Sequence, residues 1–356
     1  MADPFIVLVV NPGSTSTKIA ISSNGVISDE ETFQHDAGLL KSYDSVWGQL
    51  EDRLCLCLNW ANDRLSRCSA VVSLGGLLKP VAGGTYRVNE DMLTDAAKNI
   101  QGEHASNLGC AMAHRLAKEF SCSAYVVDPV SVDEFEPLAY YSGHPNIRRR
   151  SLSHALSIHA AAYRAAQTVH RPLAQSSFVV CHLGGGISVA PVRGGKIIDV
   201  NDAASDGPFS PDRTGGLPLQ PLIRLCFSET STEEEMRKMV MGKGGLVAYL
   251  GTNSVPEVER RIDEGDVKAE EVLRAMAYQI AKEIGAMATV LHGSADAVVL
   301  TGGMARSARL ISWIKERVKF IAPVLIEKDV NEMQALADGV WRVHHGEEVL
   351  KEYSSD

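Results

Sequence analysis

One pattern of buried strand, small-residue turn and second apolar strand occurs twice in this chain. The copies cover residues 5–10, 11–14 and 19–22, and residues 178–183, 184–186 and 187–192. They lie almost half of the 356 residues apart. Because a repeated supersecondary unit indicates repeated structure, the pattern predicts two related domains whose turns face each other and close on a phosphate chain.

The composition is that of an ordinary globular chain. Hydrophobic residues make up 45% and charged residues 22%, and the formal net charge is −9. An acidic balance argues against a dedicated nucleic-acid partner, since phosphate contacts need a basic surface. No apolar run approaches the ~20 residues that cross a bilayer. The start MADPFIVLVVNPG has no basic leader region, so we expect a buried first strand in a cytoplasmic protein with no membrane partner.

Strand-like runs alternate with helical patterns, which predicts an α/β architecture. Further strands are expected at residues 69–74, 124–127, 197–200, 297–300 and 322–326. Helices are expected at residues 91–100, 104–120, 266–291 and 331–345, and from Ser151 onward. The basic turn segment 143–150 is the expected junction, giving domains at 1–148 and 149–330. The C-terminal helix within 331–356 is expected to complete the first domain.

Three glycine-containing turns follow predicted strands. The first, NPGSTSTK at 11–18, offers hydroxyls, turn N–H groups and Lys18 to phosphate oxygens. The second, HLGGG at 182–186, and the third, LTGGMA at 300–305, let backbone approach a ligand closely. Neither a Walker A loop nor a G-x-G-x-x-G turn in a βαβ setting occurs. Each turn alone is also compatible with an ordinary hairpin or strand–helix connection.

Together with five further motifs, these turns resemble the acetokinase family, and most closely its butyrate kinases. The further motifs are GGLLKP at 75–80, GEHASNLG at 102–109, VVDPVSVDE at 126–134, SGHPNIRRRSLSHAL at 142–156 and GPFSPDRTGGLP at 207–218. The resemblance covers nearly the whole chain. It implies two related ribonuclease H-like (actin-like ATPase) α/β domains with a cleft between them. It also implies reversible, ATP-dependent phosphorylation of a short-chain fatty acid, with butanoate as the expected acceptor. ATP/ADP, Mg²⁺, the acyl phosphate and a homo-oligomer of two or more copies belong to the same expectation.

The resemblance also implies roles for individual residues. The first phosphate loop would be Asn11, Gly13, Ser14, Ser16 and Lys18, and the second His182, Gly184, Gly185 and Gly186. The remaining matches are His154 and Arg213 for the transferring oxygens, Asp128 and Glu332 for Mg²⁺, His104 and Asn107 for the acyl side, and Gly302 and Gly303 for adenosine. Asn11, His154, Arg213 and Asp128 are the catalytic candidates.

Three of these residues have structural alternatives. Asp128 precedes Pro129 and would suit a turn, Glu332 would suit a helix cap, and His154 would suit a core.

Leu74 departs from the family pattern, which carries arginine before Gly-Gly-Leu-Leu. A lost charge-assisted contact costs ~1.5–3 kcal/mol, and Lys79 or Arg87 would be the compensating groups. Leu74 therefore leaves open a nucleotide-binding homologue with impaired kinase activity. A kinase for a different or branched carboxylate, or for another acceptor such as a sugar, also remains open.

Overall fold

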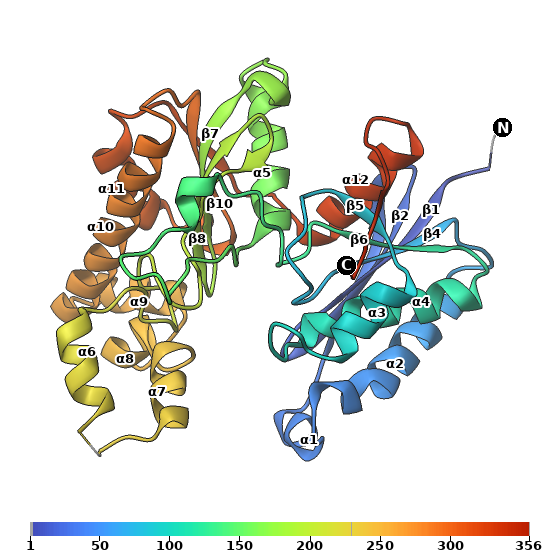
Figure 1. The fold of residues 1–356 in the computed structure, drawn as a ribbon, viewed down its shortest axis with the longest axis horizontal. Helices are drawn as coiled ribbons and strands as arrows, with labels where there is room; N and C mark the ends of the chain where they lie inside the picture. Colours follow the sequence, from blue (N-terminus) through green and yellow to red (C-terminus); the bar gives the residue numbers. More distant parts are fainter. Residues whose placement is uncertain (1–2, 229, 356) are drawn as a thin grey trace. The chain divides into compact units, whose positions relative to one another are not determined.

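The computed structural model describes residues 3–228 and 230–355, and the chain divides into two compact units (Figure 1). Unit 1 comprises residues 1–133 and 331–356, and unit 2 comprises residues 134–330. The chain therefore passes twice from one unit to the other. Among the described residues, no helix is both long and apolar enough to span a membrane.

Unit 1 is built on a seven-stranded sheet of order β12-β5-β6-β4-β1-β2-β3. The strands are β1 (Ile6–Pro12), β2 (Ser16–Ser23), β3 (Val26–Gln34), β4 (Ala70–Leu74), β5 (Thr85–Arg87), β6 (Ser123–Val127) and β12 (Lys351–Glu352). The duplicated element is the antiparallel hairpin β1–β2, and β1, β4 and β6 run parallel. The carboxyl ends of these three strands therefore lie at one edge of the sheet.

Unit 2 repeats this arrangement in a five-stranded sheet of order β11-β10-β7-β8-β9. The strands are β7 (Ser177–Leu183), β8 (Ile187–Arg193), β9 (Lys196–Ile197), β10 (Ala297–Thr301) and β11 (Val324–Glu327). The second hairpin, β7–β8, is antiparallel, and β7, β10 and β11 run parallel. Strand order and direction thus match β3-β2-β1-β4-β6 of unit 1, so the structure confirms the repeat predicted from the two hairpins.

Helices cover both faces of the unit 1 sheet (Figure 1). Its α-helices are α1 (Ala37–Ser42), α2 (Leu50–Asn62), α3 (Glu90–Ala97), α4 (Leu108–Glu119) and α12 (Glu332–His344). Helix α4 packs on β4, β6 and β1 from one side, and α12 packs on the same strands from the other. Parallel strands buried on both faces need continuous apolar sequence, which Val7, Leu8, Val9 and Val10 supply at 0–1% exposure.

Unit 2 has the same layering, with α10 and α11 on one face of the sheet and α5 on the other (Figure 1). Its α-helices are α5 (Ala155–Thr168), α6 (Leu219–Cys226), α7 (Glu233–Val240), α8 (Gly245–Leu250), α9 (Val255–Asp263), α10 (Val267–Val290) and α11 (Ala308–Val318). Val272, Met276, Ile280, Ile284 and Met287 form a buried stripe along α10. The three- and four-residue spacing of that stripe predicted this helix.

The helix that follows each sheet packs in the opposite unit. Helix α5 comes after the last parallel strand of unit 1 but packs on β7, β10 and β11 of unit 2. Helix α12 comes after the last parallel strand of unit 2 but packs in unit 1. Unit 1 therefore completes one face of its sheet with a helix encoded after all of unit 2, whereas α5 immediately precedes the strands of unit 2.

The division between the units falls before the expected junction at 143–150. It lies between Asp133 and Glu134. The Ile197 N–H donates to the Glu134 carboxylate at 2.9 Å, and the Glu136 N–H donates to the Ile198 carbonyl at 3.0 Å. These bonds tie the segment after Asp133 to unit 2, although its sequence has no strand or helix pattern.

Candidate active site

In unit 2, the hairpin β7–β8 holds two histidines and a serine together. His182 on β7 pairs in register with Ser188 on β8, and the rings of His182 and His154 stack at 4.2 Å between centroids. The Ser188 Oγ lies 2.9 Å from His154 Nδ1 and accepts the His154 backbone N–H at 3.4 Å. Where the Ser188 hydroxyl donates to Nδ1, a neutral His154 carries its proton on Nε2.

Both imidazoles are neutral in the ligand-free site. Burial lowers the pKa of His182 to about 4. Burial, then His182 and Arg213, hold the pKa of His154 well below its usual value. His154 consequently offers Nε2–H as an uncharged donor, whereas Arg213 supplies the positive charge.

Arg213 and His154 converge on Gly186. A Cβ at Gly186 would lie 2.5 Å from an Arg213 guanidinium nitrogen and 3.1 Å from His154 Cε1. Only glycine fits there without displacing both side chains. The Arg213 guanidinium also donates to the Ala203 carbonyl at 2.8 Å, while its Nε and His182 Nδ1 are buried without a hydrogen-bond partner among the described residues. Orphaned polar atoms beside a glycine loop indicate a ligand site.

A cavity of about 360 Å³ borders the same glycine loop. Its lining comprises Gly184, Gly185, Pro211, Asp212, Asn253, Ser254, Val255, Pro256, Glu259, Gly303, Met304, Arg306 and Ser307. Gly302 turns the chain here at φ +90°, and a Cβ on it would lie 2.5 Å from the Leu183 carbonyl oxygen. A Cβ on Gly303 would meet nothing within 4 Å, so the Gly303 backbone is open to a ligand.

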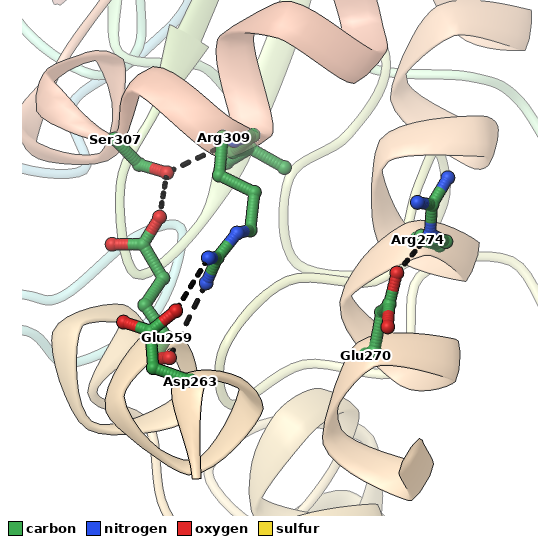
Figure 2. A network of polar contacts seen from close by, with 7 residues as sticks. Glu259, Asp263, Glu270, Arg274, Ser307 and Arg309 are labelled. Carbon is green, nitrogen blue, oxygen red and sulfur yellow. Dashed lines mark hydrogen bonds and ion pairs between the residues drawn. The ribbon is translucent and has the colours of Figure 1, made fainter. Parts of the chain in front are cut away.

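One wall of this cavity is fixed by a polar network that joins α9 to α11 (Figure 2). The Ser307 hydroxyl donates to the Glu259 carboxylate at 2.7 Å and accepts the Leu310 N–H at the start of α11. Arg309 donates to the Glu259 carbonyl and to Asp263. The network holds the Glu259 carboxylate at the cavity wall, and no sequence motif predicted a carboxylate there.

In unit 1, the hairpin β1–β2 presents the loop at 11–18 that the sequence predicts to bind phosphate. The turn closes through the Gly13 N–H bond to the Ser16 carbonyl at 2.8 Å. Ser14 and Lys18 are exposed and Ser16 is half-buried, so these groups are accessible to a ligand. Arg53, absent from the sequence-based candidates, donates from beneath the turn to the carbonyls of Gly13 and Ser16.

Candidate residues gather at the carboxyl-end edge of the unit 1 sheet. Asn11 lies in β1 beside the end of β4 at Leu74, and Asp128 directly follows β6, the next strand. Asn11 Nδ2 donates to Glu332 Oε2 at 3.0 Å, which links α12 to this edge. Glu332 is the first residue of α12, and the capping side chain belongs to Asn331.

Asp128 has an unusual backbone conformation. Its φ is +41°, which is strained for a residue with a Cβ, and its Oδ1 accepts the Gly84 N–H at 2.7 Å. Strain of this kind persists at sites where a side chain must be aimed.

Asn107 is structural rather than exposed to a substrate. It is 0% exposed, its Oδ1 accepts the Leu77 N–H, and its Nδ2 donates to Asn99 and to the Gly102 carbonyl. Its amide therefore positions the loops around Leu77 and Gly102, within the segment that we expect to line the acyl side. His104 is exposed at the start of the same segment, with its Nδ1 2.8 Å from Ser106 Oγ.

The fold is that of carboxylate kinases. The structure matches a Porphyromonas gingivalis acetate kinase with a TM-score of 0.77 and 16% identity, covering 94% of this chain and 99% of that one. It matches a propionate kinase from Francisella tularensis subsp. tularensis SCHU S4 with a TM-score of 0.76 and 19% identity, covering 94% and 98%.

Sequence comparison identifies the family. The profile of the acetokinase family matches residues 136–339. The chain is 48% identical over 352 residues to probable butyrate kinase 2 of Caldanaerobacter subterraneus subsp. tengcongensis, covering 98% of this chain and 99% of that protein. It is 46% identical over 353 residues to butyrate kinase 2 of Clostridium acetobutylicum, with the same coverage. The chain belongs to the acetokinase family, and the expected enzyme class, a kinase with a carboxyl acceptor, is confirmed.

Proposed function

We propose that this protein transfers the γ-phosphoryl group of ATP to a short-chain carboxylate, with butanoate as its preferred acceptor. The observation that carries the proposal is the convergence of Arg213 and His154 on Gly186, beside a cavity lined by Gly184 and Gly303. Similarity to two butyrate kinases over nearly the whole chain supports the choice of acceptor.

In the proposed reaction, a carboxylate oxygen forms a bond to the γ-phosphorus as the bond to the β,γ-bridging oxygen breaks. The products are the acyl phosphate and ADP, and no net proton is transferred. Phosphoryl transfer depends mainly on positioning and on charge stabilisation. Arg213 would neutralise charge on the equatorial oxygens, and the Nε2–H of His154 would donate to one of them.

The nucleotide contacts are assigned to both phosphate loops and to the cavity. Gly185 and Gly186 would donate backbone N–H groups to the phosphates. Gly184 would close the turn through its N–H bond to the Gly186 carbonyl, with His182 behind the loop. Gly302 and Gly303 would flank the adenosine. In unit 1, Asn11, Ser14, Ser16 and Lys18 would donate to the phosphate chain around the turn at Gly13. The segment that holds His104 and Asn107 would line the acyl side.

Asp128 and Glu332 fit Mg²⁺ by donor chemistry, because this ion prefers carboxylate oxygen and water. The strained backbone of Asp128 supports the assignment, and the contact from Asn11 orients the Glu332 carboxylate. Bound Mg²⁺ would neutralise phosphate charge. The described residues contain no group of three or more His, Cys, Asp or Glu side chains that could hold a metal ion.

The direct test is coupled ADP release with butanoate, 2-methylpropanoate, propanoate and acetate. We expect turnover to be highest with butanoate. Discrimination by one or two methylenes is limited to about 10–200-fold. No turnover above background on any of the four acids would refute the proposal, and a preference for the branched acid would correct the acceptor.

We extend the proposal to a cytoplasmic location and a homo-oligomer, both of which the family resemblance implies. Light scattering on the purified protein tests the second point. A monomer at micromolar concentration would contradict it.

A further inference from the structure

A buried arginine lies beneath the first phosphate hairpin. Arg53 on α2 is 1% exposed and uses all three guanidinium nitrogens. One terminal nitrogen donates to the Gly13 carbonyl at 2.9 Å, the Ser16 carbonyl at 3.1 Å and Thr17 Oγ1 at 2.9 Å. Nε and the other terminal nitrogen donate to Gln49 Oε1 at 3.1 and 2.8 Å.

All of these acceptors are electrically neutral. Among residues 3–228 and 230–355, no carboxylate forms an ion pair with Arg53. Burial lowers the pKa of Arg53 from its usual value, against smaller opposing effects of Cys57 and Tyr43, but a guanidinium remains charged at neutral pH. A buried, unpaired charge is costly, and hydrogen bonds to neutral acceptors do not cancel its field.

The hydrogen bonds beyond Arg53 run in one direction, from donor to acceptor, away from the guanidinium. Thr17 Oγ1 accepts from Arg53 and lies 2.8 Å from His35 Nε2. Burial and the Arg53 charge lower the pKa of His35, which favours a neutral ring accepting the Thr17 hydroxyl hydrogen. Gln49, Arg53, Thr17 and His35 thus form a chain without a negative charge.

The bonds from Arg53 also orient the turn. The Gly13 and Ser16 carbonyls point toward the buried guanidinium, so these acceptor dipoles are withdrawn from an incoming anion. Ser14 and Lys18 on the same hairpin remain exposed. The hairpin therefore combines donors at its surface with an uncompensated cation behind it.

We propose that Arg53 is a positioning residue whose unpaired charge is part of the anion site of the first hairpin, where the oligophosphate tail of ATP neutralises it. The inference rests on the proposed function, because it assigns that hairpin to phosphate. The inference adds Arg53, which contacts the loop at 11–18 from the protein interior, to the residues of the site. The cost of burying the charge is offset when the anion binds.

The discriminating variant is Gln49→Glu, which keeps an acceptor oxygen against Arg53 but pairs its charge with a carboxylate. We expect the ligand-free protein to melt at a higher temperature, because the buried charge is now paired. We expect its affinity for MgATP and for tripolyphosphate, measured by calorimetry, to fall about tenfold. Gln167→Glu adds the same charge at an exposed position of unit 2 and should leave both affinities unchanged.

Arg53→Met removes the charge and the donors together, with Arg115→Met as its control. Arg115 is an exposed arginine paired with Glu51, so its loss changes the net charge equally without touching the hairpin. We expect Arg53→Met to raise the KM for MgATP by tenfold or more, with a much smaller change in the KM for butanoate. Arg53→Lys should recover part of the loss.

A purely structural Arg53 predicts a different result. Gln49→Glu would then bind tripolyphosphate as the wild type does, and that outcome overturns the inference. Equal increases in both KM values for Arg53→Met would also contradict it. Because tripolyphosphate binding needs no acyl acceptor, failure of the inference is distinct from absence of turnover on carboxylates, which refutes the proposed function.

Discussion

Asp206 in unit 2 shows what a single buried acid contributes to stability. Burial raises the pKa of Asp206 to about 6, and Asp202 and Asp199 add to the rise against an opposing effect of Arg149. Its Oδ1 has no hydrogen-bond partner among the described side chains. Since the folded-state pKa exceeds the unfolded value of 3.8, the native state binds the proton more tightly, and stability falls as pH rises from about 4 to about 6.

Replacing Asp206 by Asn should therefore stabilise the protein at pH 7.5. We expect a gain of about 1–2 kcal/mol after allowance for solvent screening, and its loss below about pH 4, where the aspartate is protonated in both states. Urea unfolding from pH 4 to pH 8 measures this difference. Asp44→Asn, at an exposed position, is the control, and an unchanged pH profile for Asp206→Asn would contradict the argument.

Leu74 is a second single-residue test. It ends β4 as a half-buried residue beside Asn11 on β1, so a longer side chain has room toward solvent. We expect Leu74→Arg to raise kcat/KM for butanoate by roughly tenfold, the lower part of the range for a charge-assisted bond. Leu74→Gln, which adds length and polarity without charge, separates the two effects. A lower kcat/KM in the arginine variant would show that the leucine is the adapted residue.

At the scale of elements, the turn after β10 contains two glycines with opposite requirements. Gly302 has φ +90° and lies against the Leu183 carbonyl, whereas a Cβ on Gly303 meets nothing. Gly302→Ala should cost about 1–3 kcal/mol of stability, from backbone strain and the close contact. Gly303→Ala should melt like the wild type yet bind ATP more weakly. Thermal unfolding and nucleotide titration of the pair test this, and equal melting temperatures would refute it.

Periodicity and turn chemistry predicted the elements that have an apolar stripe or a buried run. The structure confirms α10, α12 and the central strands on that basis. Strand β3 escaped prediction because it is a polar edge strand, with only Ile27 and Phe33 partly buried. Helices α6 and α7 also escaped prediction, and neither buries a side chain. In α6 the apolar residues Leu219, Leu222, Ile223 and Cys226 do recur at helical spacing.

The family resemblance predicted most of the candidate site residues. It did not predict the buried side chains that contact them. Ser188 contacts the His154 ring, and Arg53 bonds to backbone carbonyls of the first hairpin. Such contacts depend on distances that only the fold determines. Arg53 did leave a sign in the sequence. It stands four residues before Cys57 in the buried stripe of α2, where an apolar residue is expected.

At the scale of the whole molecule, removing residues 331–356 should destabilise unit 1, although unit 2 directly precedes them in the sequence. Met333, Leu336 and Val340 of α12 are at most 2% exposed within unit 1. Truncation after Val330 uncovers one face of that sheet. We expect hydrogen exchange to accelerate by orders of magnitude in β1 and β4 and to change little in β7 and β10. Equal hydrogen-exchange rates of β1 and β4 in the truncated and the full-length protein would contradict this expectation.

The late position of α12 in the sequence also determines the order in which the two units can fold during synthesis. A ribosome delivers β1 to β6 first, but the cover for one face of their sheet arrives only with α12, after all the strands of unit 2. Until then one face of the unit 1 sheet has no covering helix, whereas α5 is already available to cover the unit 2 sheet. The half that is made first is therefore finished last, and its nascent form is the one most in need of protection from aggregation.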